Sequence, residues 1–347
     1  MKDVDHRAHT ARDAGAPRST SRFVLQNRYG SPDVLHIGRL ARPSPGRGQV
    51  LVRVKTASVN ARDWHVMRGE PRLARLLDRG TFALRRPRVA TRGTDLAGTV
   101  EAISDDVTRW RVGDHVFGEG TATFADYAVV PAAQLAPLPS GLGFDEAATL
   151  PLAGTTALLC LDAASPAPGQ SVLVNGASGG VGTFAIQIAK AMSLDVTAVV
   201  STRNVALAKS LGADRVIDYT AEDFTHTGIQ HDVVVDLVGN RGLRDLRKVV
   251  RPGGALVLSG GGVSGQGRLV GPLRLLVWGQ LYGRASGLRV ITPQAAPDSV
   301  LLERIATLAS TGQVTPVIDR HFRLDDTAEA LRYVEVQHAS GKVVVTT

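Results

Sequence analysis

The sequence predicts an α/β protein in which a β-rich first part is followed by a parallel doubly wound sheet. Before about residue 150, short apolar strands alternate with glycine and proline turns, a pattern typical of a small, partly open β-barrel. After it, strands alternate with helices, as they do in doubly wound sheets. With 347 residues, 44% hydrophobic and 21% charged, the chain suits two globular domains of about 150 residues each.

The N-terminal part begins with a polar segment. Residues 1–20 are rich in Arg, Ala, Asp, His and Ser and lack apolar periodicity, so we expect a disordered tail. This segment has neither the apolar core of a secretory signal nor the acid-poor composition of a transit peptide, and we expect a cytoplasmic protein. Strands are predicted where apolar and β-branched residues cluster between turn signals, at 22–26, 50–57, 98–103 and 111–118.

The second part begins with a strand at 171–175 and a helix at 180–192. Further strands are predicted at 195–200, 215–217, 233–236 and 255–258, with helices at 204–211 and 244–250. A helix from residue 298, a strand at 314–322, a helix at 327–336 and a strand at 342–346 close the chain. Each assignment follows from apolar period and turn signals.

A glycine-rich turn joins the strand at 171–175 to the helix that follows it. Such a turn presents backbone N–H groups and the positive end of the helix dipole to a pyrophosphate, as in Rossmann-type units. Gly179 would let the backbone approach the phosphates, and Gly182 would let the helix pack on the strand. The spacing is not a strict G-x-G-x-x-G, so the flanking strand and helix carry the argument. The predicted contacts are Gly176, Ser178, Gly179, Gly180, Val181 and Gly182.

The end of the next strand indicates which nicotinamide cofactor binds. An NAD-specific site places a carboxylate there, on the ribose 2′-hydroxyl, but residues 201–204 contain none. Ser201, Thr202 and Arg203 instead suit a 2′-phosphate through charge-assisted hydrogen bonds. We therefore predict NADPH, with the alternative that Arg203 only caps a solvated loop.

Seven segments together resemble the medium-chain dehydrogenase/reductase superfamily, in its zinc-free quinone-oxidoreductase-like branch. One is the glycine loop, and the others are RYGSPDVL (28–35), ASVNARDW (57–64), GTDLAG (93–98), GDHVFG (113–118), LPLAGTTAL (150–158) and LGADRVIDY (211–219). The resemblance covers residues 22–347. It implies a GroES-like catalytic domain at 21–149 and 296–347, built from both chain ends, around a Rossmann domain at 150–295.

The resemblance also predicts the absence of a metal. Zinc-dependent relatives carry a catalytic cysteine in the region of Asn60 and a His-Glu pair in the region of Thr94 and Asp95. Here these positions offer too few soft or imidazole ligands. The single cysteine, Cys160, lies in an apolar stretch and is expected to be a buried small hydrophobe.

Without zinc, hydrogen-bond donors must stabilise the charge that hydride transfer creates on the substrate oxygen. This requirement favours quinones and α,β-unsaturated carbonyls, whose product anions are delocalised, over simple alcohols. Asn60 matches the family's active-site asparagine and is a candidate donor, or else a turn-stabilising amide. His65 lies where relatives often have a tyrosine and is a candidate proton donor, or else an ordinary half-exposed histidine.

Other cofactor contacts are implied by position in the family pattern. Thr156 and the pair Gly260 and Gly261 are expected near the nicotinamide. Val238 and Gly239 follow a strand end, where ligands sit in open α/β sheets. Lys190 and Tyr219 are expected near the adenosine end of the cofactor.

Two stretches are longer than in the smallest relatives. Residues 68–92 place Leu73, Leu76 and Leu77 among many arginines, and residues 269–282 are apolar around Trp278. They are expected to form a lid and a subunit interface of a homodimer, or a basic apolar patch that docks on anionic membrane.

Three activities remain open for the chain. The first is NADPH-dependent reduction of a small quinone or enone, and the second is enoyl thioester or alkenal reduction on the same fold. The net charge of +8 also permits a nucleotide-binding regulatory or RNA-binding protein without turnover. However, the arginines are spread along the chain without interleaved aromatics, so nucleic acid is not expected as a partner.

Overall fold

A computed structural model describes residues 20–70, 72–73, 75, 82–259, 279, 281–284, 286–337 and 339–347. The expected disordered tail lies outside this part, except for Thr20, which begins the first strand. Within the described residues no helix is long and apolar enough to cross a membrane. Of the two longer stretches, residues 76–81 and 260–278 also lie outside it.

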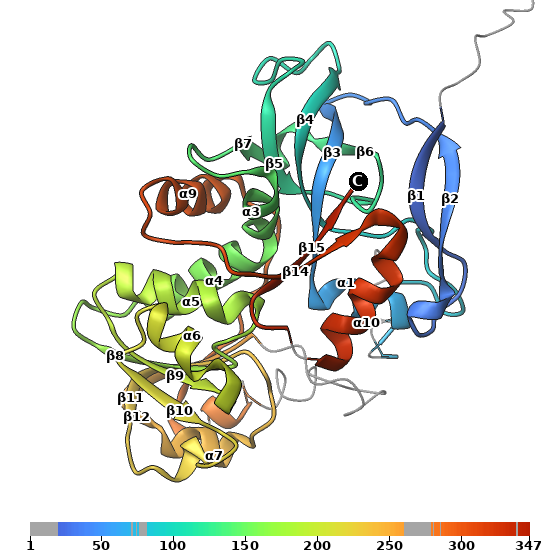
Figure 1. Cartoon of the computed structure of the whole chain (residues 1–347). Helices are drawn as coiled ribbons and strands as arrows, with labels where there is room; N and C mark the ends of the chain where they lie inside the picture. Colours follow the sequence, from blue (N-terminus) through green and yellow to red (C-terminus); the bar gives the residue numbers. More distant parts are fainter. Residues whose placement is uncertain are drawn as a thin grey trace, which may run out of the picture.

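A seven-stranded sheet forms the barrel domain, with the order β14-β15-β3-β4-β5-β7 and β6 paired to β3 (Figure 1). The last strand of the chain pairs antiparallel with β3, at Val343 opposite Val59. The barrel therefore contains both ends of the described chain, as the family resemblance implied. The strands are β3 (Gln49–Val59), β4 (Asp95–Ile103), β5 (His115–Glu119), β6 (Tyr127–Pro131), β7 (Leu135–Pro137), β14 (Ile318–Arg323) and β15 (Lys342–Thr346).

A separate antiparallel hairpin, β1 (Thr20–Gln26) with β2 (Leu35–Ala41), joins the barrel through bridges such as Phe23 to Ala125. Short helices close the barrel: α1 (Ala61–Arg68) follows β3, α3 (Phe144–Thr149) follows β7, and α10 (Thr327–Gln337) precedes β15. Single 3₁₀ turns lie at Pro32–Val34, Ala132–Gln134 and Leu324–Asp326.

The strand predicted at 111–118 begins only at His115. Residues 111–114 form a turn instead, in which the backbone N–H of Asp114 donates to the Arg111 oxygen at 3.1 Å. Gly113 permits this turn because its φ is +98°. The strand predicted at 314–322 is likewise shorter, since it starts at Ile318.

A six-stranded parallel sheet forms the second domain, with the order β10-β9-β8-β11-β12-β13. This is the doubly wound order 3-2-1-4-5-6 of dinucleotide-binding sheets, and it confirms the predicted fold class. The strands are β8 (Ser171–Asn175), β9 (Asp195–Val200), β10 (Arg215–Asp218), β11 (His231–Asp236), β12 (Val250–Leu258) and β13 (Arg289–Ile291).

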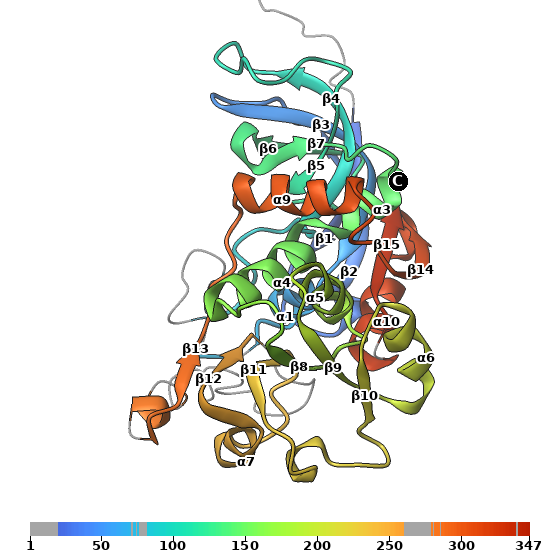
Figure 2. The same cartoon turned by 90° about the vertical axis from the view of Figure 1, so that its left-hand side faces the viewer.

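Helices α5 (Gly180–Ala191), α6 (Val205–Ser210) and α7 (Leu243–Lys248) connect strands of this sheet, with 3₁₀ turns at Thr202–Asn204 and Phe224–His226. Helix α4 (Pro151–Ala164) precedes β8, and α9 (Ser299–Ser310) follows β13 and packs on α4 and the barrel strand β7. Figure 2 shows α4 and α5 between the barrel strands and the parallel sheet. Their buried side chains form one core with β8, β9 and the adjacent barrel residues Ala97 and Phe117.

The two sheets also meet through the last strand. Gly341 lies beside Gly179 in a parallel bridge, and its backbone N–H donates to the Ser178 oxygen at 2.8 Å. The segment just before β15 thus contacts the glycine loop directly.

Candidate active site

The glycine loop has the shape that the sequence predicted. Gly176 adopts a left-handed φ of +83° after β8. A Cβ on Gly182 would lie 2.3 Å from the Gly176 oxygen, whereas a Cβ on Gly179 would meet only that same oxygen, at 3.4 Å. Gly182 is therefore needed for close packing of helix on strand, and Gly179 leaves an open side at the α5 N-terminus where an anion can approach.

Val238 lies against this loop, and Gly239 follows it at the carboxyl end of β11. Their backbone N–H groups donate to Asp236 Oδ1 at 3.1 and 3.0 Å, and Val238 Cγ2 lies 2.7 Å from the place of a Cβ on Gly176. The carboxyl end of β11 thus forms a second wall beside the loop. Gly260 and Gly261 lie outside the described residues.

Two of the predicted contacts, Ser178 and Ser201, are linked by a residue that the sequence argument missed. Asn204 Nδ2 donates to Ser178 Oγ at 3.0 Å and to Ser201 Oγ at 3.3 Å, and Asn204 Oδ1 accepts from Ser340 Oγ at 2.7 Å. Asn204 directly follows the predicted residues Ser201, Thr202 and Arg203, so the sequence could have indicated it. The sequence could not indicate Ser340, because this residue comes from the far end of the chain.

The prediction that no carboxylate is available at this strand end is wrong, because the end of the neighbouring strand supplies one. Asp218, at the end of β10, accepts a hydrogen bond from Thr202 Oγ1 at 2.6 Å. Parallel pairing places the ends of β9 and β10 side by side, which sequence distance along one strand does not reveal. The Thr202 hydroxyl is first among the hydrogen bonds that lower the pKa of Asp218. Arg203 and Tyr219 are exposed nearby, Tyr219 at 51%.

Lys190, expected near the adenosine end of the cofactor, lies away from the glycine loop. It lies in the last turn of α5, ten residues and about 15 Å from the helix start. Its ammonium donates to Asp214 Oδ2 at 2.7 Å and to the Leu194 oxygen at 3.2 Å. This ion pair ties the helix end to the segment before β10, so Lys190 has a structural role here.

On α4, Thr156 presents an unused polar atom. Its Oγ1 is buried and has no hydrogen-bond partner among the described residues, and the residue is 7% exposed. Together with the open side of Gly179, this orphan hydroxyl fits a nicotinamide dinucleotide lying across the loop, which would supply the missing partner. One turn further, Cys160 is fully buried and burial raises the pKa of its thiol to about 11, so it packs as expected and is no nucleophile.

Asn60 is the centre of a buried polar cluster at the barrel end that faces the glycine loop. It precedes α1, and its backbone N–H donates to Asp63 Oδ2 at 2.8 Å. Its side-chain Nδ2 donates to Asp95 Oδ2 at 2.8 Å. The amide is thus fixed by tertiary contacts and does more than stabilise a turn. Burial raises the pKa of the neighbouring Asp63 to about 6.

Lys342 supplies the positive charge of this cluster. Its ammonium donates to Asn60 Oδ1 and, at 3.2 Å, to the Val59 oxygen, and it lies 3.8 Å from Asp95 Oδ2. Burial raises the pKa of Asp95 and lowers that of Lys342, while each opposes the shift of the other. In the sequence, Lys342 is a lone lysine in the apolar strand 342–346, and this pattern alone does not indicate a role in the site.

His65 is placed apart from this cluster. Its ring stacks on Trp64 with centroids 3.7 Å apart, and its Nδ1 lies 3.2 Å from the Glu70 oxygen. These described contacts hold it at the end of α1, away from the helix start where Asn60 lies. Among the described residues, no group of three or more His, Cys, Asp or Glu side chains is arranged to hold a metal ion.

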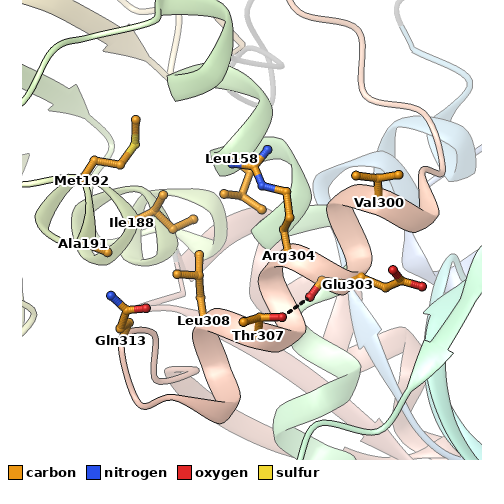
Figure 3. A pocket seen from close by; sticks show the side chains of 10 residues that line it. All are labelled: Leu158, Ile188, Ala191, Met192, Val300, Glu303, Arg304, Thr307, Leu308 and Gln313. Carbon is orange, nitrogen blue, oxygen red and sulfur yellow. Dashed lines mark hydrogen bonds between the residues drawn. The ribbon is translucent and has the colours of Figure 1, made fainter.

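A hollow of about 410 Å³ opens elsewhere on the surface, between α4, α5 and α9. Figure 3 shows the side chains that line it, among which are the apolar Leu158 and Ile188 and the charged Arg304 and Glu303. None of the predicted site residues lines it, so it is not the dinucleotide site.

Comparison with known proteins places these features in a family pattern. The model described as "Alcohol dehydrogenase GroES-like domain" matches residues 46–140, and that described as "Zinc-binding dehydrogenase" matches residues 211–345. The first corresponds to most of the barrel, and the second spans part of the parallel sheet and the returning C-terminal strands.

Individual relatives match over nearly the whole chain. A 2-methylene-furan-3-one reductase of Solanum lycopersicum is 34% identical over 332 residues, which are 91% of this chain and 76% of that protein. A chloroplastic NADPH-dependent alkenal/one oxidoreductase of Arabidopsis thaliana is 31% identical, over 96% of this chain and 81% of the relative. The solved quinone oxidoreductase from Coxiella burnetii superposes with a TM-score of 0.82 at 27% identity, over 95% and 100% of the two chains.

Proposed function

The chain belongs to the medium-chain dehydrogenase/reductase superfamily, in its quinone-oxidoreductase-like branch, and is an oxidoreductase that uses a nicotinamide cofactor; we propose that it is a zinc-independent enzyme that uses NADPH to reduce quinones or α,β-unsaturated carbonyls. The observation that carries the proposal is the Asn60 amide, anchored by Asp95 and Lys342 at the barrel end facing the glycine loop. Relatives named as alkenal/one and quinone oxidoreductases support this substrate class.

The proposal gives each part of the cofactor its own set of residues. Backbone N–H groups at the start of α5 would hold the pyrophosphate, and Thr156 Oγ1 would bond the nicotinamide end. NADPH, when bound, supplies a hydride. Asn60 would stabilise the resulting anion, because its Nδ2 has a second hydrogen that no described residue accepts.

Zinc independence is supported by the donor set itself. The three positions where zinc-dependent relatives place ligands hold Asn60, Thr94 and Asp95 here, none of which is a thiolate or an imidazole. The Lys342 ammonium already contacts both Asn60 and Asp95. A divalent cation there would be repelled by this ammonium.

The preference for NADPH is supported by Ser201 and Arg203 at the end of β9, which can donate hydrogen bonds to a 2′-phosphate. Asp218 opposes it, because its carboxylate lies at the same edge. We propose that the donors prevail when the phosphate is bound.

The decisive experiment is an NADPH-oxidation screen across quinones, alkenals and enoyl thioesters, with NADH alongside. Fast turnover of quinones or enones with NADPH is expected. A strong preference for enoyl thioesters would favour the alternative reductase, and equal rates with NADH would overturn the cofactor assignment. Tight NADPH binding without turnover, accompanied by salt-sensitive RNA binding, would favour a regulatory protein.

For its partners and location, we propose a cytoplasmic homodimer that acts on small molecules and does not bind nucleic acid. Light scattering at low micromolar concentration tests the dimer. The membrane alternative predicts sedimentation with anionic liposomes at low salt, and failure to sediment would exclude it. Fractionation of cells that produce the protein tests the location.

A further inference from the structure

Three polar side chains stand in a row across three neighbouring barrel strands. Ser58 of β3 lies opposite Asp95 of β4, and Asp95 lies opposite Glu119 of β5. Directly opposed residues of antiparallel strands project to the same face. Ser58 Oγ donates to Asp95 Oδ2 at 3.0 Å, which confirms that face for the first pair.

The two carboxyl groups of this row have unequal surroundings. Asp95 receives hydrogen bonds from Ser58 and Asn60 and lies beside the Lys342 ammonium. Glu119 is 4% exposed and receives no hydrogen bond from a described residue. One lysine serves two opposed carboxyl groups, and the hydrogen bonds favour the charged form of Asp95, whereas Glu119 has no such bonds to favour its charged form.

The charges around Glu119 agree with this difference. The described charged side chains that act on it are Asp95 on β4, Arg62 on α1 and Lys342 on β15. Burial, followed by the repulsion of Asp95, raises the pKa of Glu119 to about 7, and the two cations do not offset it. A carboxylic acid is thus held ready to give up a proton near neutral pH.

Glu119 also lies at the end of a strand against which the helix carrying Thr156 packs. It ends β5, and α4 packs on both β4 and β5. This helix carries Thr156, whose buried hydroxyl has no partner in the part of the chain that the structure describes. The row therefore lies on the face of the barrel that is turned toward the proposed nicotinamide site.

We propose that Glu119 is the proton donor of the reduction. This inference rests on the proposed function. Once hydride has reached the β-carbon of the enone, the electron pair of its C=C bond moves to the α-carbon and the carbonyl oxygen. The O–H bond of Glu119 then breaks as a C–H bond forms at the α-carbon, or an O–H bond on a quinol, and water reprotonates the carboxylate.

The test compares wild type with Glu119→Gln, which keeps the size and neutrality of the acid but has no proton to give, and with the matched control His65→Gln. The substrate is an α-substituted enone in D₂O. Wild type and His65→Gln should place deuterium on one face of the α-carbon. Glu119→Gln should lower kcat by about 10²-fold or more and give both product configurations, while NADPH binding, followed by fluorescence, stays unchanged.

Infrared difference spectra of the cofactor-free protein give an independent readout. The carbonyl band of a protonated carboxyl group should disappear as the pH rises through about 7, and it should be absent in Glu119→Gln. A variant that is slower but still stereospecific, or a missing band in wild type, would overturn the proposal. If none of the tested acceptors supports NADPH oxidation by the wild type, the proposed function fails and the donor role fails with it. The infrared spectra would still show whether Glu119 is protonated.

Discussion

The ammonium of Lys342 donates a hydrogen bond to the side-chain oxygen of Asn60 across 282 positions of sequence. The lysine comes from the first position of β15, and its stem passes the glycine loop, where its Cδ lies 2.9 Å from the place of a Cβ on Gly180. One side chain therefore contacts the cofactor loop and the proposed substrate-binding amide. This contact fixes the carbonyl of Asn60 on the lysine side and leaves its NH₂ group to Asp95 and the substrate.

Replacing Lys342 by Met should destabilise the fold and slow the reaction. It leaves the fully buried Asp95 without its cation, and breaking a buried pair costs about 3–5 kcal/mol. The free energy of unfolding from urea titration checks the first effect, and kcat the second. Lys55→Met on β3 is the control, because Lys55 is exposed and should change neither. A stable, fully active Lys342→Met enzyme would contradict the assigned contact.

Much of the parallel sheet could be predicted from local sequence. Buried parallel strands are continuous apolar runs, so the strand at 171–175 was predicted with its observed bounds. Gly182 could be assigned its packing role for the same reason, since loop, strand and helix are adjacent in the chain. Sequence reasoning fails where a feature depends on which strands pair.

The barrel end shows that limit. Asp95 and Glu119 are opposed only through the register of β4 and β5, and Lys342 reaches Asn60 only because β15 pairs with β3. Asp218 likewise reaches Thr202 through the pairing of β9 with β10. Each residue looks ordinary in its own segment, and its role arises from long-range pairing, which neither periodicity nor turn signals specify.

Two glycines of the loop should respond differently to alanine. Gly182→Ala puts a methyl group 2.3 Å from a backbone oxygen, so it should lower stability, by about 1–3 kcal/mol as an overpacking change. Gly179→Ala has room in the free protein but places its methyl group on the open side of the loop. It should fold normally and bind NADPH weakly.

Thermal unfolding together with NADPH fluorescence titration separates the two effects. Gly242→Ala, at the equally open start of α7, is the control and should change neither quantity. Tight NADPH binding by Gly179→Ala would mean that the pyrophosphate does not approach the loop at this position.

Asp218→Asn should strengthen NADPH binding selectively. The half-buried carboxylate lies at the edge where the 2′-phosphate would bind, and its removal takes away a repulsion while leaving an acceptor for Thr202. Since solvent reaches the site, the gain should shrink as salt rises. Arg203→Ala should have the opposite effect and weaken NADPH binding. Dissociation constants for NADPH and NADH at two salt concentrations check both, and equal effects on the two cofactors would place the phosphate elsewhere.

Glu119 should make the protein less stable as the pH rises. Because burial raises its pKa from 4.5 to about 7, the native state holds a proton in this window that the unfolded chain has released, so the free energy of unfolding falls as the pH increases. A shift of this size corresponds to about 3 kcal/mol. Asp63, whose pKa is raised to about 6, should likewise make the free energy of unfolding fall as the pH rises, but at lower pH.

Glu119→Gln removes the contribution of Glu119 to this pH dependence and leaves that of Asp63. Relative to wild type, the variant should gain stability between about pH 5 and about pH 8, as measured by urea unfolding at both values. Glu222→Gln, an exposed site, should follow wild type throughout. If the difference between Glu119→Gln and wild type is the same at both pH values, Glu119 does not titrate in this window and its carboxyl is already ionised in the folded protein.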